Sequence, residues 1–319
     1  MRRVLGLVPV LLAAATIVWI FVFLLPGDPA RLIAGGQAAD PQVIETIRHE
    51  WGLDRPVPIQ YAGYLGKLLR FDLGSSYIQK RSVASIIAAQ FPPTLILATA
   101  GVLIAAIFGV GLGSLAALRR GRLLDSLVLI AALLGTSMPV FWLGLILMLL
   151  FASRLGWFPV LGYGMEGAMI PFTEIRLPEW NHLVLPAITL SLVSMGAIAR
   201  ITRASLIEGG TAEFLRTARA KGASGVRVFA RHALQNALIP IVTIVGLDFA
   251  SLLGGAVATE YVFAWPGLGR TIVRAIGLRD LPVVEGGVLF LTGIFVLVSL
   301  ALDVLYLVLD PRIHYSSTA

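Results

Sequence analysis

The chain has 319 residues, of which 57% are hydrophobic and 13% are charged, and its mean hydropathy is +0.88. Soluble globular domains carry roughly a quarter charged residues, so this composition excludes that class and indicates an all-α polytopic membrane protein. The formal net charge is +7, but excess arginine is expected in cytoplasmic loops, and no nucleic-acid-binding motif accompanies it. We therefore expect no nucleic-acid partner.

Residues that commonly hold metals or act as nucleophiles are scarce. The chain has no cysteine, and its four histidines show neither HxxxH nor HExxH spacing. The sequence therefore predicts no metal site and no catalytic residue.

Six segments are long and apolar enough to be transmembrane helices, for which about 20 apolar residues are needed. The first follows Arg2 and Arg3 as in a signal peptide, but its length and the lack of a small-residue cleavage site predict a retained helix over 1–25. The six predicted spans cover about residues 4–25, 94–118, 123–152, 183–207, 238–259 and 284–309.

Lysine and arginine set the expected orientation. With the N-terminus inside, short cytoplasmic loops hold Arg119, Arg120 and Arg122 and a basic stretch over 208–237. We therefore expect both termini in the cytoplasm, including a tail over 313–319.

The segment over 26–93 is expected outside the cytoplasm and carries two short amphipathic helices. Asp40 and Pro41 are a plausible start for the first, in which Val43, Ile44, Ile47 and Trp51 recur at helical spacing. The second carries Tyr61, Tyr64, Leu65, Leu68 and Leu69 on one face. These helices either pack on the ends of the bundle or form a docking platform.

The basic stretch over 208–237 is expected to form a helical hairpin. Residues 211–221 contain neither Pro nor Gly, which favours a short helix; Gly222 is placed to end it, and Ser224 to start a second. Composition alone is equally consistent with a basic loop that only enforces topology.

Particular motifs favour a more specific interpretation. "RTARAKG" at 216–222 and "RHALQNALIP" at 231–240 resemble the cytoplasmic coupling loop of ATP-binding-cassette (ABC) importer permeases of the dipeptide, oligopeptide and nickel class. The leading Glu of the general Glu-Ala-Ala motif is absent here, a departure that fits the peptide subclass. The resemblance extends along the chain through "FDLGSSY" at 71–77, "GTSMPVFWLGL" at 135–145, "EYVFAWPGLGR" at 260–270 and "LDVLYLVLDPRI" at 302–313.

The resemblance implies a type I ABC importer permease fold, with a core of five spans over 94–312 after the first helix. It also implies a multi-pass protein of the bacterial inner membrane that moves di- or oligopeptides, or a related solute, by alternating access. The implied partners are a second homologous permease, two cytoplasmic ATPase subunits, an extracytoplasmic solute-binding protein and membrane lipid. The chain has no GxxxxGK[ST] motif, so we expect it to bind no cofactor, with ATP and Mg held by the partner subunits.

In that family the coupling loop contacts the ATPase. The first predicted helix offers apolar packing, guanidinium groups and a glycine turn for such a contact. The candidate coupling residues are Glu213, Phe214, Leu215, Arg216, Thr217, Ala218, Arg219, Lys221 and Gly222.

Polar residues within the spans are candidates for the solute path. Asp248 lies mid-span, where an ionisable side chain is costly; it either lines the path and attracts a peptide's ammonium group or bonds a neighbouring helix. Asp303 is more consistent with a structural role. The other path candidates are Ser137, Met138, Ser191 and Ser194.

Prolines and glycines predict local geometry. Pro139 and Pro186 are expected to kink their spans, and Gly109 with Gly113 favours close helix packing. The segment after span five is expected to make a tight turn at Pro266 and Gly267, and either folds back near the outer gate or is an ordinary loop. The candidate gate residues are Phe263, Trp265, Pro266 and Gly267.

Two other functions remain open at this stage. An ion-coupled secondary transporter would use intramembrane carboxylates such as Asp248 and Asp303. An intramembrane Ser/His enzyme would need a histidine at membrane depth, for which His182 is the nearest candidate.

Overall fold

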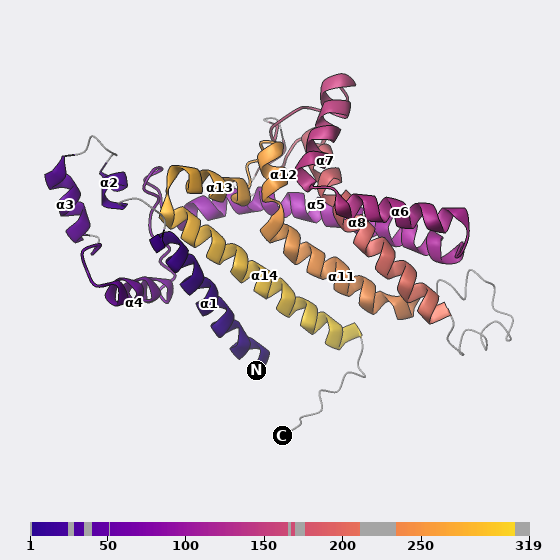
Figure 1. The fold of residues 1–319 in the computed structure, drawn as a ribbon, viewed down its shortest axis with the longest axis horizontal. Coiled ribbons are helices and arrows are strands. Elements are labelled where there is room, and N and C mark those ends of the chain that lie inside the picture. The colour runs from indigo at the N-terminus through magenta and orange to yellow at the C-terminus, as the bar shows by residue number, and fades with distance from the viewer. Residues whose placement is uncertain are drawn as a thin grey trace. The chain divides into compact units, whose positions relative to one another are not determined.

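The computed structural model describes residues 2–24, 29–34, 40–50, 52–164, 167–169, 176–210 and 234–309. Across these residues the fold is helical and contains no named strand (Figure 1). The chain divides into two compact units, Met1–Pro92 with Pro266–Gly293 and Pro93–Trp265 with Ile294–Ala319. Each is described by itself.

The first unit contains the N-terminal helices and the segment after residue 265. Its core is formed by Val83, Ile86, Leu268, Ile272 and Val283, which pack together with little exposure to solvent. Its helices are α1 (Arg2–Leu24), α2 (Pro29–Ile33), α3 (Pro41–Glu50), α4 (Val57–Leu68), the start of α5 (Val83–Leu118), α13 (Leu268–Leu278) and the start of α14 (Leu281–Leu309).

This unit contains short helices at both expected places, α3 and α4, and Trp51 lies outside the described residues. The backbone N–H of Gln42 donates to Asp40 Oδ1 at 2.9 Å, which is the expected cap at the start of α3. In α4, Tyr61, Tyr64, Leu65 and Leu68 are half-buried on one face, whereas Leu69 is 84% exposed and was wrongly included. Leu69 is the C-cap residue of α4, and no other described part of the chain covers its side chain there. In the last turn of α3, His49 Nδ1 lies 3.0 Å from Asp54 Oδ2, and this hydrogen bond lowers the pKa of the Asp54 carboxyl.

The second unit contains most of the predicted core. Helix α6 runs alongside α8, and α8 alongside α11 (Figure 1). Its helices are the remainder of α5, α6 (Leu123–Ser137), α7 (Val140–Leu147), the π-helix η1 (Met148–Arg154), α8 (Trp180–Gly210), α11 (Leu234–Gly255), α12 (Val257–Val262) and the remainder of α14.

The glycine pair of α5 makes a close helix contact, as expected. A Cβ at Gly109 would meet Ile198, and a Cβ at Gly113 would collide with the carbonyl oxygen of Ala199. Both contacts lie on α8, so only glycine allows α5 and α8 to approach so closely.

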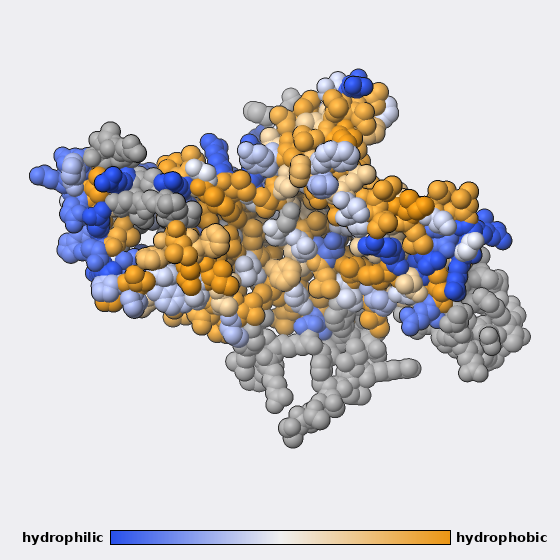
Figure 2. Space-filling model, viewed as in Figure 1, coloured by the Kyte–Doolittle hydropathy of each residue, from blue (hydrophilic) through white to orange (hydrophobic). Residues whose placement is uncertain are grey.

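Among the described residues, four helices are long and apolar enough to cross a membrane: α5, α8, α11 and α14. The pair formed by α6 with α7 and η1 makes a fifth span if it is counted as one. In α1 the apolar stretch Val8–Leu24 is shorter. Apolar side chains cover much of the outward surface of these helices, as a lipid-facing surface requires (Figure 2).

Three boundaries differ from the sequence-based expectation. Helix α5 begins at Val83 and runs through Pro92 and Pro93, so the end of the 26–93 segment is helical rather than a connection. The predicted span over 123–152 is not a single straight helix but bends by 105° between Ser137 and Val140. Third, the predicted span over 238–259 is not one helix, because α11 ends at Gly255 and the short α12 follows.

The bend has a local cause. Pro139 disfavours helical geometry in the residue before it, and Met138 is extended, with φ −85° and ψ 135°. The predicted kink at Pro139 is thereby confirmed, whereas α8 runs without interruption through Pro186.

Candidate functional site

Asp248 and Ser194 are the two path candidates that the structure brings together. They lie on the adjacent helices α11 and α8, and the Ser194 side chain lies close to the Asp248 carboxylate. The Oδ2 atom of Asp248 is buried and has no hydrogen-bond partner among the described residues. Polar atoms in such positions are rare in folded proteins, so this carboxylate retains capacity for a further donor.

The remaining path candidates are satisfied locally. Ser191 Oγ donates to the carbonyl oxygen of Ile188 at 2.8 Å, and Ser137 Oγ donates to that of Leu133 at 2.8 Å. Met138 is half-buried at the bend after α6. These hydroxyls support their own helices, which is a common role for serine in apolar helices. Asp303 also has an interaction partner.

Residues 263–265, which we call the Trp265 turn, are packed rather than loose. Phe263 and Trp265 are buried, and Trp265 Nε1 donates to the carbonyl oxygen of Pro93 at 2.9 Å. Between them Ala264 has φ 52°, a left-handed conformation that is uncommon for a residue other than glycine. Pro266 and Gly267 begin the segment that enters α13, with Gly267 as the residue before its first turn.

Tyr163 covers the other side of Trp265. The two rings meet edge to face with centroids 4.6 Å apart, and the Tyr163 hydroxyl donates to the carbonyl oxygen of Arg176 at 2.8 Å. Burial raises the pKa of Tyr163 to about 12. The backbone N–H of Gly162 also donates to the carbonyl oxygen of Phe263 at 2.9 Å, so two chain segments hold the turn.

Glu260 is a functional candidate that the sequence analysis did not single out. It is fully buried, and Thr94 Oγ1 donates to its Oε1 at 2.6 Å. Its own carbonyl oxygen accepts the backbone N–H of Trp265 at 2.8 Å. The sequence does contain a signal for Glu260, because it is a charged residue directly after the apolar run over 238–259.

A second carboxylate missed from the sequence is Asp125. It forms a two-pronged ion pair with Arg203, in which Arg203 Nη2 lies 2.8 Å from Asp125 Oδ2, and it also accepts the backbone N–H of Gly121 at 3.0 Å. The pair fixes the start of α6 to α8. Bidentate arginine–carboxylate pairs are geometrically specific, so Arg203 holds two helices together through Asp125.

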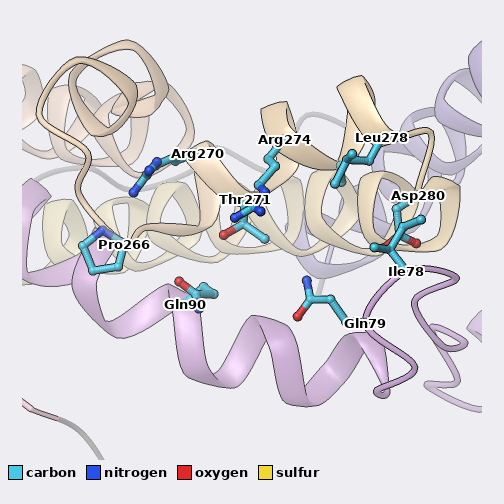
Figure 3. Close-up of a pocket in the computed structure, with 10 residues that line it drawn as sticks. Ile78, Gln79, Gln90, Pro266, Arg270, Thr271, Arg274, Leu278 and Asp280 are labelled. Atoms are coloured by element: carbon cyan, nitrogen blue, oxygen red, sulfur yellow. The ribbon is translucent and has the colours of Figure 1, made fainter. Parts of the chain in front are cut away.

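In the first unit, Asp280 joins two segments far apart in the chain. It is buried, and it accepts hydrogen bonds from the Ser76 hydroxyl and from the backbone N–H of Tyr77, the latter at 2.9 Å. It lies just after α13, beside a pocket that Figure 3 shows between α13 and the beginning of α5. The sequence analysis expected a turn at Pro266 but not the helix that follows it.

The candidate coupling residues over 213–222 and the expected hairpin lie outside the described residues, as does the tail over 313–319. Helix α8 ends before this loop at Gly210, and α11 begins after it at Leu234. Within the part of the chain that the structure describes, no group of three or more acidic, histidine or cysteine side chains is placed to hold a metal ion. His182 Nδ1 lies 3.0 Å from Asn181 Oδ1, beside Glu179.

Comparisons with known proteins agree over nearly the whole chain. Residues 109–315 match the binding-protein-dependent transport system inner membrane component, and residues 1–98 match the N-terminal part of such membrane components. The chain is 42% identical over 315 residues to the glutathione transport system permease protein GsiC of Salmonella paratyphi A, covering 99% of this chain and 98% of that protein. GsiC of Escherichia coli K12 is also 42% identical, over 314 residues and 98% of each chain.

A solved structure supports the fold. The chain resembles the MetNI methionine ABC transporter in an inward-facing conformation, with a TM-score of 0.55, 18% identity, and coverage of 70% of this chain and 96% of that one. The chain therefore belongs to the family of binding-protein-dependent transport system inner membrane components and is a multi-pass inner-membrane subunit of an ATP-driven importer, in which separate subunits hydrolyse ATP.

Proposed function

We propose that this chain forms half of a path for di- or oligopeptides or a related small solute such as glutathione, moved from an extracytoplasmic binding protein to the cytoplasm by alternating access. The observation that supports the solute class is the 42% identity to GsiC, whose name assigns it to glutathione transport. A second, similar permease completes the path, and surrounding lipid contacts the apolar outer surface.

The proposed topology has six spans with both termini in the cytoplasm. In it α1 and the bent pair α6 with α7 and η1 each cross the membrane, in addition to α5, α8, α11 and α14. Because the chain has no cysteine, single cysteines can be introduced and probed with a membrane-impermeant thiol reagent. Labelling from outside at Leu69→Cys but not at Gly121→Cys is expected, and the reverse pattern would reject this topology.

The loop over 208–237 is the proposed contact with the ATPase, and ATP and Mg are bound only in the partner subunits. Phe214, Leu215 and Ala218 are proposed to pack in a groove on the ATPase, and Arg216 and Arg219 to supply charge complementarity. The small residues Ala218 and Gly222 permit close approach and the turn.

Two variants test this contact. Ala218→Glu places a charge on the proposed packing face and Gly222→Pro removes the glycine that is expected to end the first helix, so each is expected to leave the protein in the membrane while uncoupling ATP hydrolysis from uptake. Ala220→Glu, on a neighbouring position outside the packing face, is the matched control. Normal uptake by both variants would rule out this contact.

The solute class is tested by reconstituting the complete importer with its binding protein in vesicles loaded with ATP. Uptake of labelled glutathione and of dipeptides is compared with that of methionine. ATP-dependent uptake of glutathione or a dipeptide is expected. Uptake of methionine alone would overturn the proposed solute class.

Asp248 and Ser194 are the proposed polar part of the path, and the Trp265 turn with Pro266 and Gly267 is the proposed outer gate. The unpartnered Oδ2 atom of Asp248 supports the first assignment, because a carboxylate oxygen without a donor can accept one from a passing ammonium group.

A further inference from the structure

The first unit contains a pocket of ≈ 450 Å³ whose polar side chains have no role in the functions proposed above, although Pro266 of the proposed outer gate also lines it (Figure 3). Arg270, Thr271 and Arg274 come from α13 on one wall, and Gln79 and Gln90 face them from the turn before α5 and from α5 itself. The volume is in the range of small-molecule sites, roughly 300–1,000 Å³.

The polar groups of this pocket are predominantly hydrogen-bond donors. Arg270 and Arg274 are one helical turn apart, so their guanidinium groups project from the same side of α13. Arginine has five N–H donors and no acceptor, and the two glutamine amides add further donors, whereas the Thr271 hydroxyl donates to the carbonyl oxygen of Gly267 at 2.9 Å. Such a set matches an oxyanion, for which the planar arginine fork gives two parallel hydrogen bonds.

The one carboxylate among the described lining residues is held in place by other groups. The two oxygens of Asp280 accept hydrogen bonds from the Ser76 hydroxyl and the Tyr77 backbone N–H. The backbone N–H of Gln79 in turn donates to Ser76 Oγ at 2.8 Å. Asp280 thus fixes the turn that carries Gln79.

The opposite wall is fixed by apolar packing. Leu268, Ile272 and Ala275 are buried in the core of the first unit, so α13 is held by the face opposite its arginines. The backbone segments that carry Arg270, Arg274 and Gln79 are therefore positioned before any ligand arrives, which lowers the entropic cost of binding.

We propose that this pocket, lined by Arg270, Arg274, Gln79 and Gln90, binds the oxyanion of a small molecule, and that the carboxylate of the imported solute is its ligand. In that form the inference rests on the proposed solute class. The phosphate of an anionic lipid headgroup has the same oxyanion chemistry and is the alternative source.

The test measures binding to the complete importer, without its binding protein, in phosphatidylcholine nanodiscs that contain no anionic lipid. Leu278→Cys on the pocket wall carries an environment-sensitive fluorophore and is the sole cysteine of this chain. As a control, importer that contains the unsubstituted chain is treated with the same fluorophore. Its signal comes from labelled partner subunits and is subtracted. Ile78→Cys gives a second, independent label position on the pocket.

Dialanine, dialaninamide and inorganic phosphate are the probes. We expect a saturable signal with dialanine and binding at least about tenfold weaker with dialaninamide, because the amide removes the charged acceptor. Arg270→Gln and Arg274→Gln should each weaken dialanine binding about tenfold. Arg279→Gln, which removes a charge from the same region but does not line the pocket, should leave it unchanged.

The source of the oxyanion follows from a second set of nanodiscs made with phosphatidylglycerol. Phosphatidylglycerol competes for the pocket if dialanine binds the parent protein more weakly in these nanodiscs than in phosphatidylcholine. If this difference is absent in Arg274→Gln, the lipid phosphate occupies the pocket and the oxyanion assignment stands. Equal binding of dialanine and dialaninamide, or unchanged binding in both pocket arginine variants, would overturn the proposal. Uptake of glutathione or dipeptides is measured separately, so its failure would overturn the proposed solute class without deciding whether dialanine binds this pocket.

Discussion

Two buried carboxylates of the second unit, Glu260 and Asp248, have opposite surroundings. Glu260 is fully buried, accepts the Thr94 hydroxyl at 2.6 Å and belongs to the densely bonded surroundings of the Trp265 turn. Asp248 is half-buried, lies close to Ser194, and keeps one buried oxygen without a partner among the described residues.

The difference indicates different roles for two residues of the same chemistry. Removing one partner of a satisfied buried pair leaves the other unsatisfied, so Glu260 and its neighbours should matter to stability. A carboxylate with remaining acceptor capacity costs stability and is tolerated where it serves another purpose, so Asp248 should matter to transport.

The largest effect on stability is expected at Trp265. Trp265→Ala removes a fully buried ring and its hydrogen bond to the Pro93 carbonyl oxygen, and should lower the free energy of unfolding by about 3–5 kcal/mol. Thermal unfolding of the purified importer, followed by size-exclusion chromatography, measures this. Trp265→Phe keeps most of the ring and is the control.

The same variants separate packing from gating. If Trp265→Phe folds normally but admits solute or ions without ATP, the turn is part of a gate as well as of the core. A fully stable Trp265→Ala would contradict the packing described for this turn.

A smaller loss is expected at the Thr94–Glu260 pair. Glu260→Leu removes the carboxylate that accepts the hydrogen bond of the buried Thr94 hydroxyl and should cost about 1–3 kcal/mol of unfolding free energy. Glu260→Gln retains an acceptor oxygen and should lose less. If Thr94→Val combined with Glu260→Leu is no more stable than Glu260→Leu alone, the cost does not come from this hydrogen bond.

The sequence predicted those features that depend on local pattern. Apolar length located α5, α8, α11 and α14, helical spacing located α3 and α4, and Pro139 located the bend. The coupling loop was inferred from its motif, and its residues remain a prediction.

The paired carboxylates could not be predicted in this way because their partners are distant in the chain. Thr94 and Glu260 are 166 residues apart, and Ser76 and Asp280 are 204 residues apart. Neither the helical period nor a motif encodes such a pairing. Helix α13 was missed for a different reason, because the segment after the Pro266–Gly267 turn was expected to be a fold-back or an ordinary loop. The proximity of Asp248 and Ser194 could have been predicted from the sequence, since both are polar residues in neighbouring spans.

The smallest effect on stability, with a large effect on transport, is expected at Asp248. Asp248→Asn keeps the shape of the side chain and can retain the contact with Ser194, so the free energy of unfolding should change by less than about 1 kcal/mol. Loss of the negative charge removes the attraction for a peptide ammonium group, and uptake of a dipeptide should fall about tenfold. Ser194→Ala keeps the charge and is the matched control, for which uptake should fall less. Unchanged uptake together with a loss of several kcal/mol in Asp248→Asn would make Asp248 a structural residue like Glu260.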